Sequence, residues 1–297
     1  MKVLIAGASG LIGTALVAAF RGRGDEVHTL VRRAPANSTE HSWDPVAGSI
    51  AADLPQQFDA VINLSGASIG KLPWSARYRR ELVDSRLAAT RTVASAILSK
   101  QIATKVFVSA SGSGFYGNRG DETLTESSSR GGGFLAGLCE QWEAEARKAD
   151  SATRVVAIRT GVVLAPRGGA LARLLPLVKL GVGGPLGTGK QWWPWITLTD
   201  EVNAIIHLAS STDSASAYNL VSPESATNAM LTRELGAQLH RPTLIAAPAF
   251  ALRLVLGEAA DEVLLASTKI EPKRLTDAGF SFTHPDLKSA VRYVLGK

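Results

Sequence analysis

At 297 residues, the chain is long enough for one large core or for a nucleotide-binding domain with a smaller domain attached. Hydrophobic residues make up 45% of the sequence and charged residues 20%, a composition that excludes a disordered chain. The formal net charge is +6, but Lys and Arg are scattered without a basic stripe interleaved with aromatic residues, so we expect no nucleic-acid partner.

The single cysteine, Cys139, excludes an intramolecular disulfide bond and suits a reducing compartment. Residues Met1–Ala6 read as a strand and leave no room for a signal peptide. No apolar run reaches the roughly 18 residues expected of a membrane helix, and the five histidines are not spaced like metal-ligand pairs. We therefore expect a cytoplasmic protein that neither spans a membrane nor binds a metal.

Strands and helices alternate over the first part of the chain. Apolar runs predict strands at Val3–Ala6, Glu26–Val31, Asp59–Leu64, Lys105–Ser109 and Arg154–Leu164. Helical patterns cover Leu11–Arg23, Ala76–Leu98 and Leu135–Lys148. Strands separated by helices indicate a parallel sheet covered on both faces, so the expected fold class is α/β, a Rossmann-type doubly wound parallel sheet.

The pattern changes beyond Pro166. A loop rich in Gly, Pro and Trp occupies Gly181–Ile196, and mostly helical patterns follow it, with a strand-like segment at Ala217–Val221. We predict a Rossmann domain over residues 1–165, to which the segment 197–222 returns. A smaller, mostly helical domain is expected over residues 166–297.

The segment Gly7–Gly13 has the form G-x-x-G-x-x-G and lies between the first strand and the first helix. Glycines allow a tight turn there and let backbone N–H groups approach a pyrophosphate, to which the helix N-terminus adds its partial positive charge. The alternative is a glycine-rich turn without a ligand. We expect a dinucleotide to contact Gly7, Ser9, Gly10, Leu11, Ile12 and Gly13.

The end of the second strand indicates which dinucleotide binds. NAD-selective sites place an acidic residue there, about 20 positions after the glycines, to accept a hydrogen bond from the ribose 2′-OH. Here the strand ends in Arg32 and Arg33, and guanidinium groups suit a 2′-phosphate. The alternative is a solvated basic turn. We therefore predict NADP(H) as the cofactor.

Further motifs follow in order along the chain: VINLSGA at 61–67, SGSGFYG at 111–117, RTGVVL at 159–164 and QWWPWI at 191–196. Together with the glycine loop, they resemble the extended short-chain dehydrogenase/reductase superfamily. Within it, the sequence looks like the epimerase-like branch described as nucleoside-diphosphate-sugar epimerases or cell-division inhibitors. The resemblance covers the whole chain, including the characteristic C-terminal domain around 279–287.

The resemblance implies roles for several residues. Four residues at and just beyond the end of the third strand should pass beneath the cofactor: Asn63, Leu64, Ser65 and Gly66. Val162 or Val163 should lie near the nicotinamide. Glu81 and Arg86 match charged positions that contact the dinucleotide in this branch, although Glu81 could equally lie on a solvated helix face.

The charge of Arg86 interrupts the apolar period set by Leu82 and Leu87 in its helix, and an unpaired buried guanidinium is costly. A direct pair with Glu81 is unfavourable, because five residues at ~100° each place the two side chains about 140° apart. We therefore predict that Arg86 faces the dinucleotide cleft and supplies positive charge near the ribose or the nicotinamide.

Active members of the superfamily carry Tyr-x-x-x-Lys, in which the tyrosine exchanges a proton and the lysine lowers its pKa. The helix that should carry this pair begins FLAGLCE. With Phe134 or Leu135 in the place of the tyrosine, the residue four positions on is Leu138 or Cys139, so neither register supplies Tyr or Lys. Ser111 is the candidate for the residue that polarises the substrate, and Tyr116 is the candidate acid, with Ser109 and Ser113 as alternatives. All of them could instead be loop hydroxyls that satisfy backbone groups.

Two functions fit these residues. The first is an NADP(H)-dependent oxidoreductase or epimerase-like enzyme that acts on an unidentified small polar metabolite. The second is a non-catalytic NADP(H)-binding module that reports redox state to a partner, which the missing dyad favours. Trp192, Trp193 and Trp195 could form one wall of a substrate pocket or could pack between the two domains.

Overall fold

The centre of the molecule is an eight-stranded sheet, seen in the computed structural model, which describes residues 1–172, 174–213 and 215–297. Its strands are β1 (Lys2–Ala6), β2 (Glu26–Val31), β3 (Glu40–Asp44), β4 (Ser49–Ile50), β5 (Gln57–Asn63), β6 (Ala103–Gly112), β8 (Arg154–Thr160) and β12 (Ala217–Leu220). Their order is β12-β8-β6-β5-β1-β2-β3-β4, and every neighbouring pair is parallel except β3 and β4.

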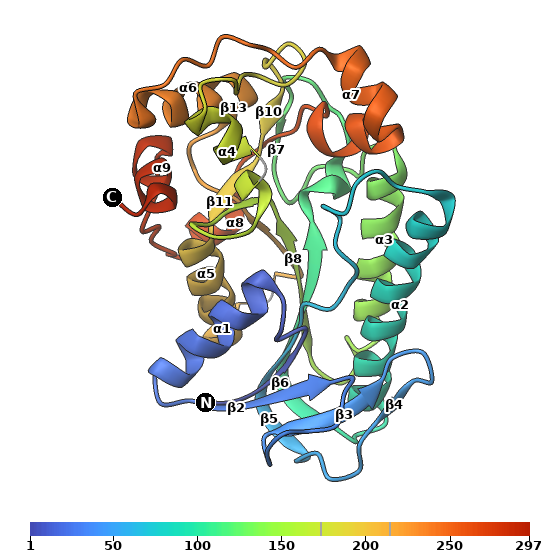
Figure 1. Ribbon diagram of the computed structural model, residues 1–297. Helices are drawn as coiled ribbons and strands as arrows, with labels where there is room; N and C mark the ends of the chain where they lie inside the picture. The colour runs from blue at the N-terminus through green and yellow to red at the C-terminus, as the bar shows by residue number, and fades with distance from the viewer. Residues whose placement is uncertain (173, 214) are drawn as a thin grey trace.

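Helices cover both faces of this sheet (Figure 1). One face is covered by α1 (Leu11–Gly22) and α5 (Leu198–Ser210), and the other by α2 (Ala76–Leu98) and α3 (Phe134–Arg147). Because neither face meets water, the inner strands are near-continuous apolar runs: Ile5, Ile62 and Val108 are 0% exposed. The predicted α/β fold class, a doubly wound Rossmann-type sheet, is confirmed.

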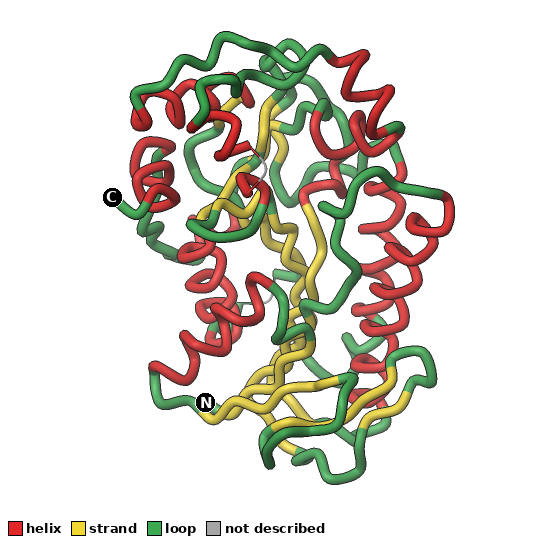
Figure 2. The backbone as a smooth tube through the Cα atoms, viewed as in Figure 1, coloured by secondary structure: helices red, strands yellow, loops and turns green. Residues whose placement is uncertain are grey.

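The remaining elements lie mostly above the carboxyl ends of the strands, where Figure 2 shows short strands among helices and loops. The small paired strands are β7 (Thr123–Leu124) with β14 (Lys269–Ile270), β9 (Val162–Leu164) with β11 (Trp195–Thr197), and β10 (Trp192–Trp193) with β13 (Ala226–Thr227). The helices are η1 (Ser113–Tyr116), η2 (Ala170–Ala172), α4 (Leu174–Lys179), α6 (Asn228–Leu239), α7 (Ala249–Leu256), η3 (Ala260–Leu264), α8 (Lys273–Asp277) and α9 (Leu287–Leu295).

This second part has an apolar core of its own. Trp193 and Trp195 pack there with Leu231 of α6 and Val291 of α9. The segment that contains α5 and β12 lies between the two parts in sequence, but it packs on the central sheet, where β12 pairs with β8. The chain therefore crosses to the second part after β9. It returns to the central sheet for α5 and β12 and then leaves the sheet again.

The strand predicted at Arg154–Leu164 is wrong in one respect, because it is two strands. Gly161 separates β8 from β9: its N–H donates to the carbonyl of Leu220, whereas the next N–H, from Val162, donates to Pro194. A Cβ at Gly161 would lie 2.5 Å from the carbonyl oxygen of Pro194, so only glycine fits this close approach. The break redirects the chain from the central sheet to the tryptophan-rich loop.

Candidate functional site

The candidate site is the crevice where the strand order reverses. From β1 the sheet continues through β2 and β3 on one side and through β5, β6 and β8 on the other. In such open sheets a ligand binds outside the carboxyl ends of the strands, at the point of reversal. The loops that follow β1, β5 and β6, and β9 after β8, all lie at this edge of the sheet (Figure 1).

The three glycines of the loop after β1 have three different environments. Gly7 has φ +84°, and a Cβ there would lie 2.7 Å from the carbonyl carbon of Leu64. A Cβ at Gly13 would lie 2.2 Å from the carbonyl oxygen of Gly7, so the first helical turn packs directly on the strand. At Gly10, a Cβ would meet only that same oxygen, at 3.4 Å. Gly10 therefore leaves its outer side open to a ligand, beside the uncapped amides that begin α1.

The loop after β5 passes against the glycine loop and is tied to α2. Asn63 is 0% exposed, and its side-chain amide donates to the hydroxyl of Thr90 at 3.0 Å. The backbone N–H of Ser65 donates to the Asn63 side-chain oxygen at 3.1 Å. Within the described part of the chain, the buried hydroxyl of Ser65 has no hydrogen-bond partner. A cofactor that lay over this loop would supply one.

Arg86 lies directly beneath the same loop. Its guanidinium is within 3.4 Å of a Cβ built on Gly66, and it lies over the Trp142 ring, 5.0 Å from the centroid. The residue is 5% exposed, and Nη1 donates to the carbonyl of Leu82 at 3.0 Å. Among the described residues, the buried Nε has no partner and no carboxylate pairs with the charge.

Burial lowers the pKa of the Arg86 guanidinium, and the nearby side chains of Cys139 and Tyr78 only partly oppose this shift. An arginine nevertheless stays charged in a protein. A buried cation without a counter-ion is costly, which makes Arg86 a site where an anionic or strongly polar ligand would be stabilised. Arg86 is buried, whereas Glu81 on the same helix is exposed, and the contacts predicted between these two residues and a dinucleotide stay predictions.

Arg32 and Arg33 follow β2 and are both exposed, beside the glycine loop. Arg32 forms no ion pair with any residue that the structure describes, whereas Arg33 forms one with Glu40 of β3. Val162 is half-buried, and its N–H donates to the carbonyl of Pro194. The contacts predicted between these residues and a dinucleotide stay predictions.

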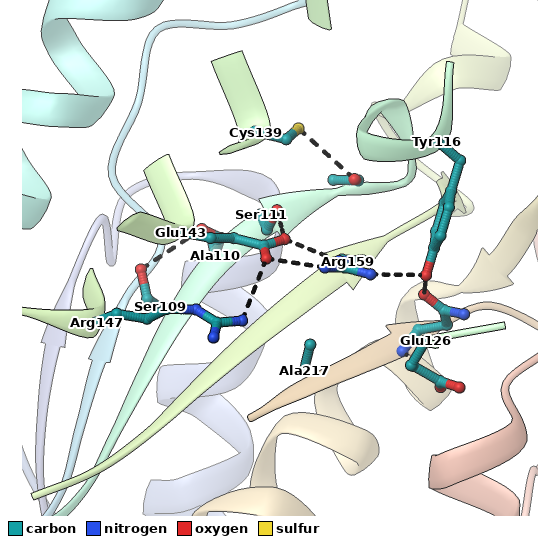
Figure 3. A network of polar contacts seen from close by, with 12 residues as sticks. Ser109, Ala110, Ser111, Tyr116, Glu126, Cys139, Glu143, Arg147, Arg159 and Ala217 are labelled. Atoms are coloured by element: carbon teal, nitrogen blue, oxygen red, sulfur yellow. Dashed lines mark hydrogen bonds and ion pairs between the residues drawn. The ribbon is translucent and has the colours of Figure 1, made fainter. Parts of the chain in front are cut away.

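The candidate catalytic residues belong to a buried polar network (Figure 3). Ser111 donates its hydroxyl hydrogen to the carboxylate of Glu143 at 2.8 Å. Two guanidinium nitrogens of Arg159 donate to the two oxygens of that carboxylate, at 2.8 and 2.9 Å. The third nitrogen of Arg159 donates to the Tyr116 hydroxyl at 3.0 Å, and Tyr116 in turn donates to Asn219 at 2.7 Å.

This network leaves neither hydroxyl free. Tyr116 is 0% exposed, and burial raises its pKa, although the charge of Arg159 opposes the shift. Its hydroxyl hydrogen is already donated to Asn219, so it has none to give to a substrate in this arrangement. Ser111 is likewise bound to Glu143. Their predicted catalytic roles stay predictions. The alternative expected these hydroxyls to satisfy backbone groups, whereas the partners of Ser111 and Tyr116 are buried side chains.

Helix α3 presents apolar and acidic side chains, and no Tyr or Lys, to the crevice side of β6. Leu135, Leu138 and Cys139 are buried there with Glu143. The Cys139 thiol donates to the Gly112 carbonyl at 3.6 Å, and burial raises its pKa to about 11. This thiol is therefore neither a nucleophile nor a substitute for the missing lysine.

One acidic group was not anticipated from the sequence. Glu201 of α5 is 0% exposed, and it accepts a hydrogen bond from the Thr160 hydroxyl at the end of β8, at 2.7 Å. Its second oxygen is buried without a partner among the described residues. Burial raises the pKa of Glu201 to about 8, only partly offset by Thr160, so this carboxyl is protonated at neutral pH. The acidic pair Asp200-Glu201 resembles an ordinary first helical turn, so no pattern in the sequence distinguishes Glu201 as a buried acid.

Two rings of the tryptophan-rich loop pack within the second part itself, and not between the two domains as one expectation had it. Trp193 and Trp195 are 8% and 1% exposed and pack in the core of the second part. Trp192 is half-buried; its indole N–H donates to Asp121, and the Lys269 ammonium lies 5.1 Å from its ring centroid. Core packing therefore accounts for two of the three rings.

An open groove of about 990 Å³ lies between the ends of α1 and α5 and residues 278–281, at the edge of the sheet opposite the crevice. Over residues 1–172, 174–213 and 215–297, no group of three or more His, Cys, Asp or Glu side chains is placed to hold a metal ion. Within the same residues, no helix is both long and apolar enough to span a membrane.

Comparison with known proteins gives the same fold. Residues 3–221 match the NAD dependent epimerase/dehydratase family, and residues 247–294 match a domain of unknown function, DUF1731. An epimerase family protein of Mycobacterium bovis is 42% identical over 292 residues, which cover 98% of this chain and 96% of the relative. The human epimerase family protein SDR39U1 is 35% identical over 302 residues, which cover 99% of this chain and 100% of the relative.

Two solved structures are similar over the whole chain. The crystal structure of human SDR39U1 with NADPH has a TM-score of 0.92 and 33% identity, and the match covers 100% of this chain and 99% of that one. A nucleoside-diphosphate sugar epimerase from Corynebacterium glutamicum has a TM-score of 0.79 and 33% identity, over 100% of this chain and 58% of the other. The resemblance inferred from the motifs is confirmed: the chain belongs to the NAD dependent epimerase/dehydratase family.

Proposed function

We propose that the protein binds NADP(H) and transfers hydride to or from an unidentified small polar metabolite, as an oxidoreductase or epimerase-like enzyme. The observation that carries the proposal is Arg86, a buried cation without a carboxylate partner in the described chain, beneath the loop at 63–67. It lies at the same edge of the sheet as the open side of Gly10 and the exposed Arg32 and Arg33. The NADPH in the structure of human SDR39U1 supports the same cofactor.

Each group in the crevice fits one part of this cofactor. The free amides at the start of α1, beside Gly10, would hold the pyrophosphate. Arg32 and Arg33 would hold the 2′-phosphate, since a guanidinium matches phosphate oxygens with several donors. Ser65 and Arg86 would complete their hydrogen bonds on the nicotinamide half. The bound nicotinamide supplies the hydride acceptor or donor, and the chain's own residues orient it and exclude water.

Proton transfer in this reaction needs a donor other than the family's tyrosine, because Tyr-x-x-x-Lys is absent. Tyr116 would act as the acid only if it exchanged its bond to Asn219 for one to the substrate. Its engagement in the buried network supports a second candidate function, a non-catalytic NADP(H)-binding module. For both the enzyme and the non-catalytic module, we also propose that the protein binds a small molecule, binds no nucleic acid and is located in the cytoplasm.

The activity is tested by mixing the protein with NADPH and a panel of aldehydes, ketones and nucleoside-diphosphate sugars, and recording the loss of NADPH absorbance. We expect oxidation with at least one class of carbonyl compound. Tyr116→Phe should abolish it if the tyrosine is the acid; undiminished oxidation by that variant excludes the role. NADPH binding without any turnover would favour the non-catalytic module.

A further inference from the structure

The loop 32–39, between β2 and β3, is folded around one carboxylate. Glu40, the first residue of β3, accepts hydrogen bonds from both terminal nitrogens of Arg33, each at 2.7 Å. It also accepts the backbone N–H of Ala36 at 2.7 Å. These bonds, with that of Arg33 the strongest, lower the pKa of Glu40 to about 2. The carboxylate is therefore ionised at any pH in which the protein would be used, and it closes the loop.

Arg33 has N–H donors that the bonds within the loop do not use. A guanidinium carries five N–H groups in one plane. Nη1 donates to Glu40 and to the carbonyl of Ala34, the latter at 2.8 Å, and Nη2 donates to Glu40. The Nε hydrogen and the second Nη2 hydrogen have no acceptor among the described residues. These two donors lie side by side on one edge of the plane and form a second two-donor face.

Arg33 lies in the region where a 2′-phosphate would come. β2 pairs with β1 in parallel, with Leu30 opposite Ala6, so the residues after β2 are beside the glycine loop that follows β1. Arg33 has a side chain that is 59% exposed, whereas that of Glu40 is 15% exposed. The carboxylate is thus on the protein side of the guanidinium, and the free edge can meet a ligand.

We propose that Glu40 is a positioning residue that makes the site selective for the phosphomonoester of NADP(H). It fixes one face of Arg33 so that the other is presented to the 2′-phosphate, and it holds the loop closed through Ala36. NAD-selective sites place an acidic residue at the end of the second strand, where its free carboxylate accepts from the ribose 2′-OH. Here that strand is followed by arginines, and Glu40, at the start of the next strand, pairs with Arg33 and so favours the opposite cofactor. This inference rests on the proposed function.

The experiment compares the wild type with Glu40→Gln by isothermal titration with NADPH and with NADH. Glutamine keeps the size but loses the charge and one acceptor, so Arg33 is released and the loop loosens. We expect NADPH affinity to fall about tenfold while NADH affinity changes less than about twofold. Arg33→Ala should weaken NADPH binding at least as much, and adding Glu40→Gln to it should cause no further loss, because the two residues act as a unit.

Glu122→Gln is the matched control, since Glu122 likewise accepts two hydrogen bonds from one arginine, Arg119, but belongs to a segment other than the loop 32–39. It should leave both affinities unchanged. Tighter NADPH binding by Glu40→Gln would show that the carboxylate repels the phosphate, and unchanged binding would show that it has no role; either result overturns the inference alone. A wild type that binds no NADPH would overturn the proposed function as well.

Discussion

Removal of the charge of Arg86 should have opposite effects on cofactor affinity and on the stability of the free protein. In the free protein, this guanidinium is 5% exposed and donates one hydrogen bond, to the Leu82 carbonyl, and no carboxylate that the structure describes neutralises it. Arg86→Met keeps most of the volume and removes the charge. Since an uncompensated buried charge costs several kcal/mol, we expect the variant's Tm to rise, by about 2–4 °C for each kcal/mol regained.

The effect on binding should be the reverse. A charge-assisted hydrogen bond to the cofactor contributes about 1.5–3 kcal/mol, so Arg86→Met should weaken NADPH binding by roughly one to two orders of magnitude. Both quantities are measured on the same preparation, by thermal denaturation without ligand and by titration with NADPH.

Arg91 provides the matched control, because it lies on the same helix but is exposed and paired with Glu145. Arg91→Met should change neither quantity by more than a small amount, since exposed ion pairs contribute about 0–1 kcal/mol. If Arg86→Met lowers the Tm and leaves NADPH affinity unchanged, Arg86 is a structural residue and the reasoning is wrong.

Three further predictions concern the loop and the two buried acids. Gly10→Ala should keep the wild-type Tm and lose NADPH affinity, because its Cβ would meet only one protein atom, at 3.4 Å. Gly13→Ala should lower both the Tm and the NADPH affinity, because its Cβ would lie 2.2 Å from the Gly7 carbonyl oxygen. Equal Tm values for the two variants would contradict this reasoning. Glu201 has a folded-state pKa of about 8, raised from 4.5, so the folded state holds a proton that the unfolded state loses. Stability should therefore fall between about pH 5 and 8, by up to about 1.4 kcal/mol per unit, and Glu201→Gln should flatten that slope in pH-dependent urea unfolding. Glu143→Gln breaks the buried pair with Arg159 and should cost about 3–5 kcal/mol in the same assay, and a loss below about 1 kcal/mol would show that the network is not stabilising.

Features that depend on neighbours in sequence could be predicted. The glycine loop and the charge of Arg86 inside an apolar period are local patterns, and the structure places Gly10 and Arg86 at one edge of the sheet. The predicted alternation of strands and helices also gave the doubly wound sheet. These inferences needed only the periods of helix and strand and the steric freedom of glycine.

Features that depend on register between distant strands could not be predicted. Ser111 and Asn219 each lie opposite Arg159 in the sheet, which is why one guanidinium can join their partners in a single network. The strand β3 was missed because its sequence, EHSWD, is mostly polar and buries only His41 and Trp43. Without that strand, neither the ion pair between Arg33 and Glu40 nor the free donor edge of Arg33 could be predicted.

The most direct test of the central claim is a titration of the wild-type protein with NADPH and with NADH at one ionic strength. The exposed Arg32 and Arg33 beside the glycine loop predict that NADPH binds at least about tenfold more tightly, and that replacing both arginines with alanine removes the difference. Equal affinities for the two cofactors would contradict NADP(H) selectivity, and a failure to bind either would contradict the assignment of the crevice as a dinucleotide site.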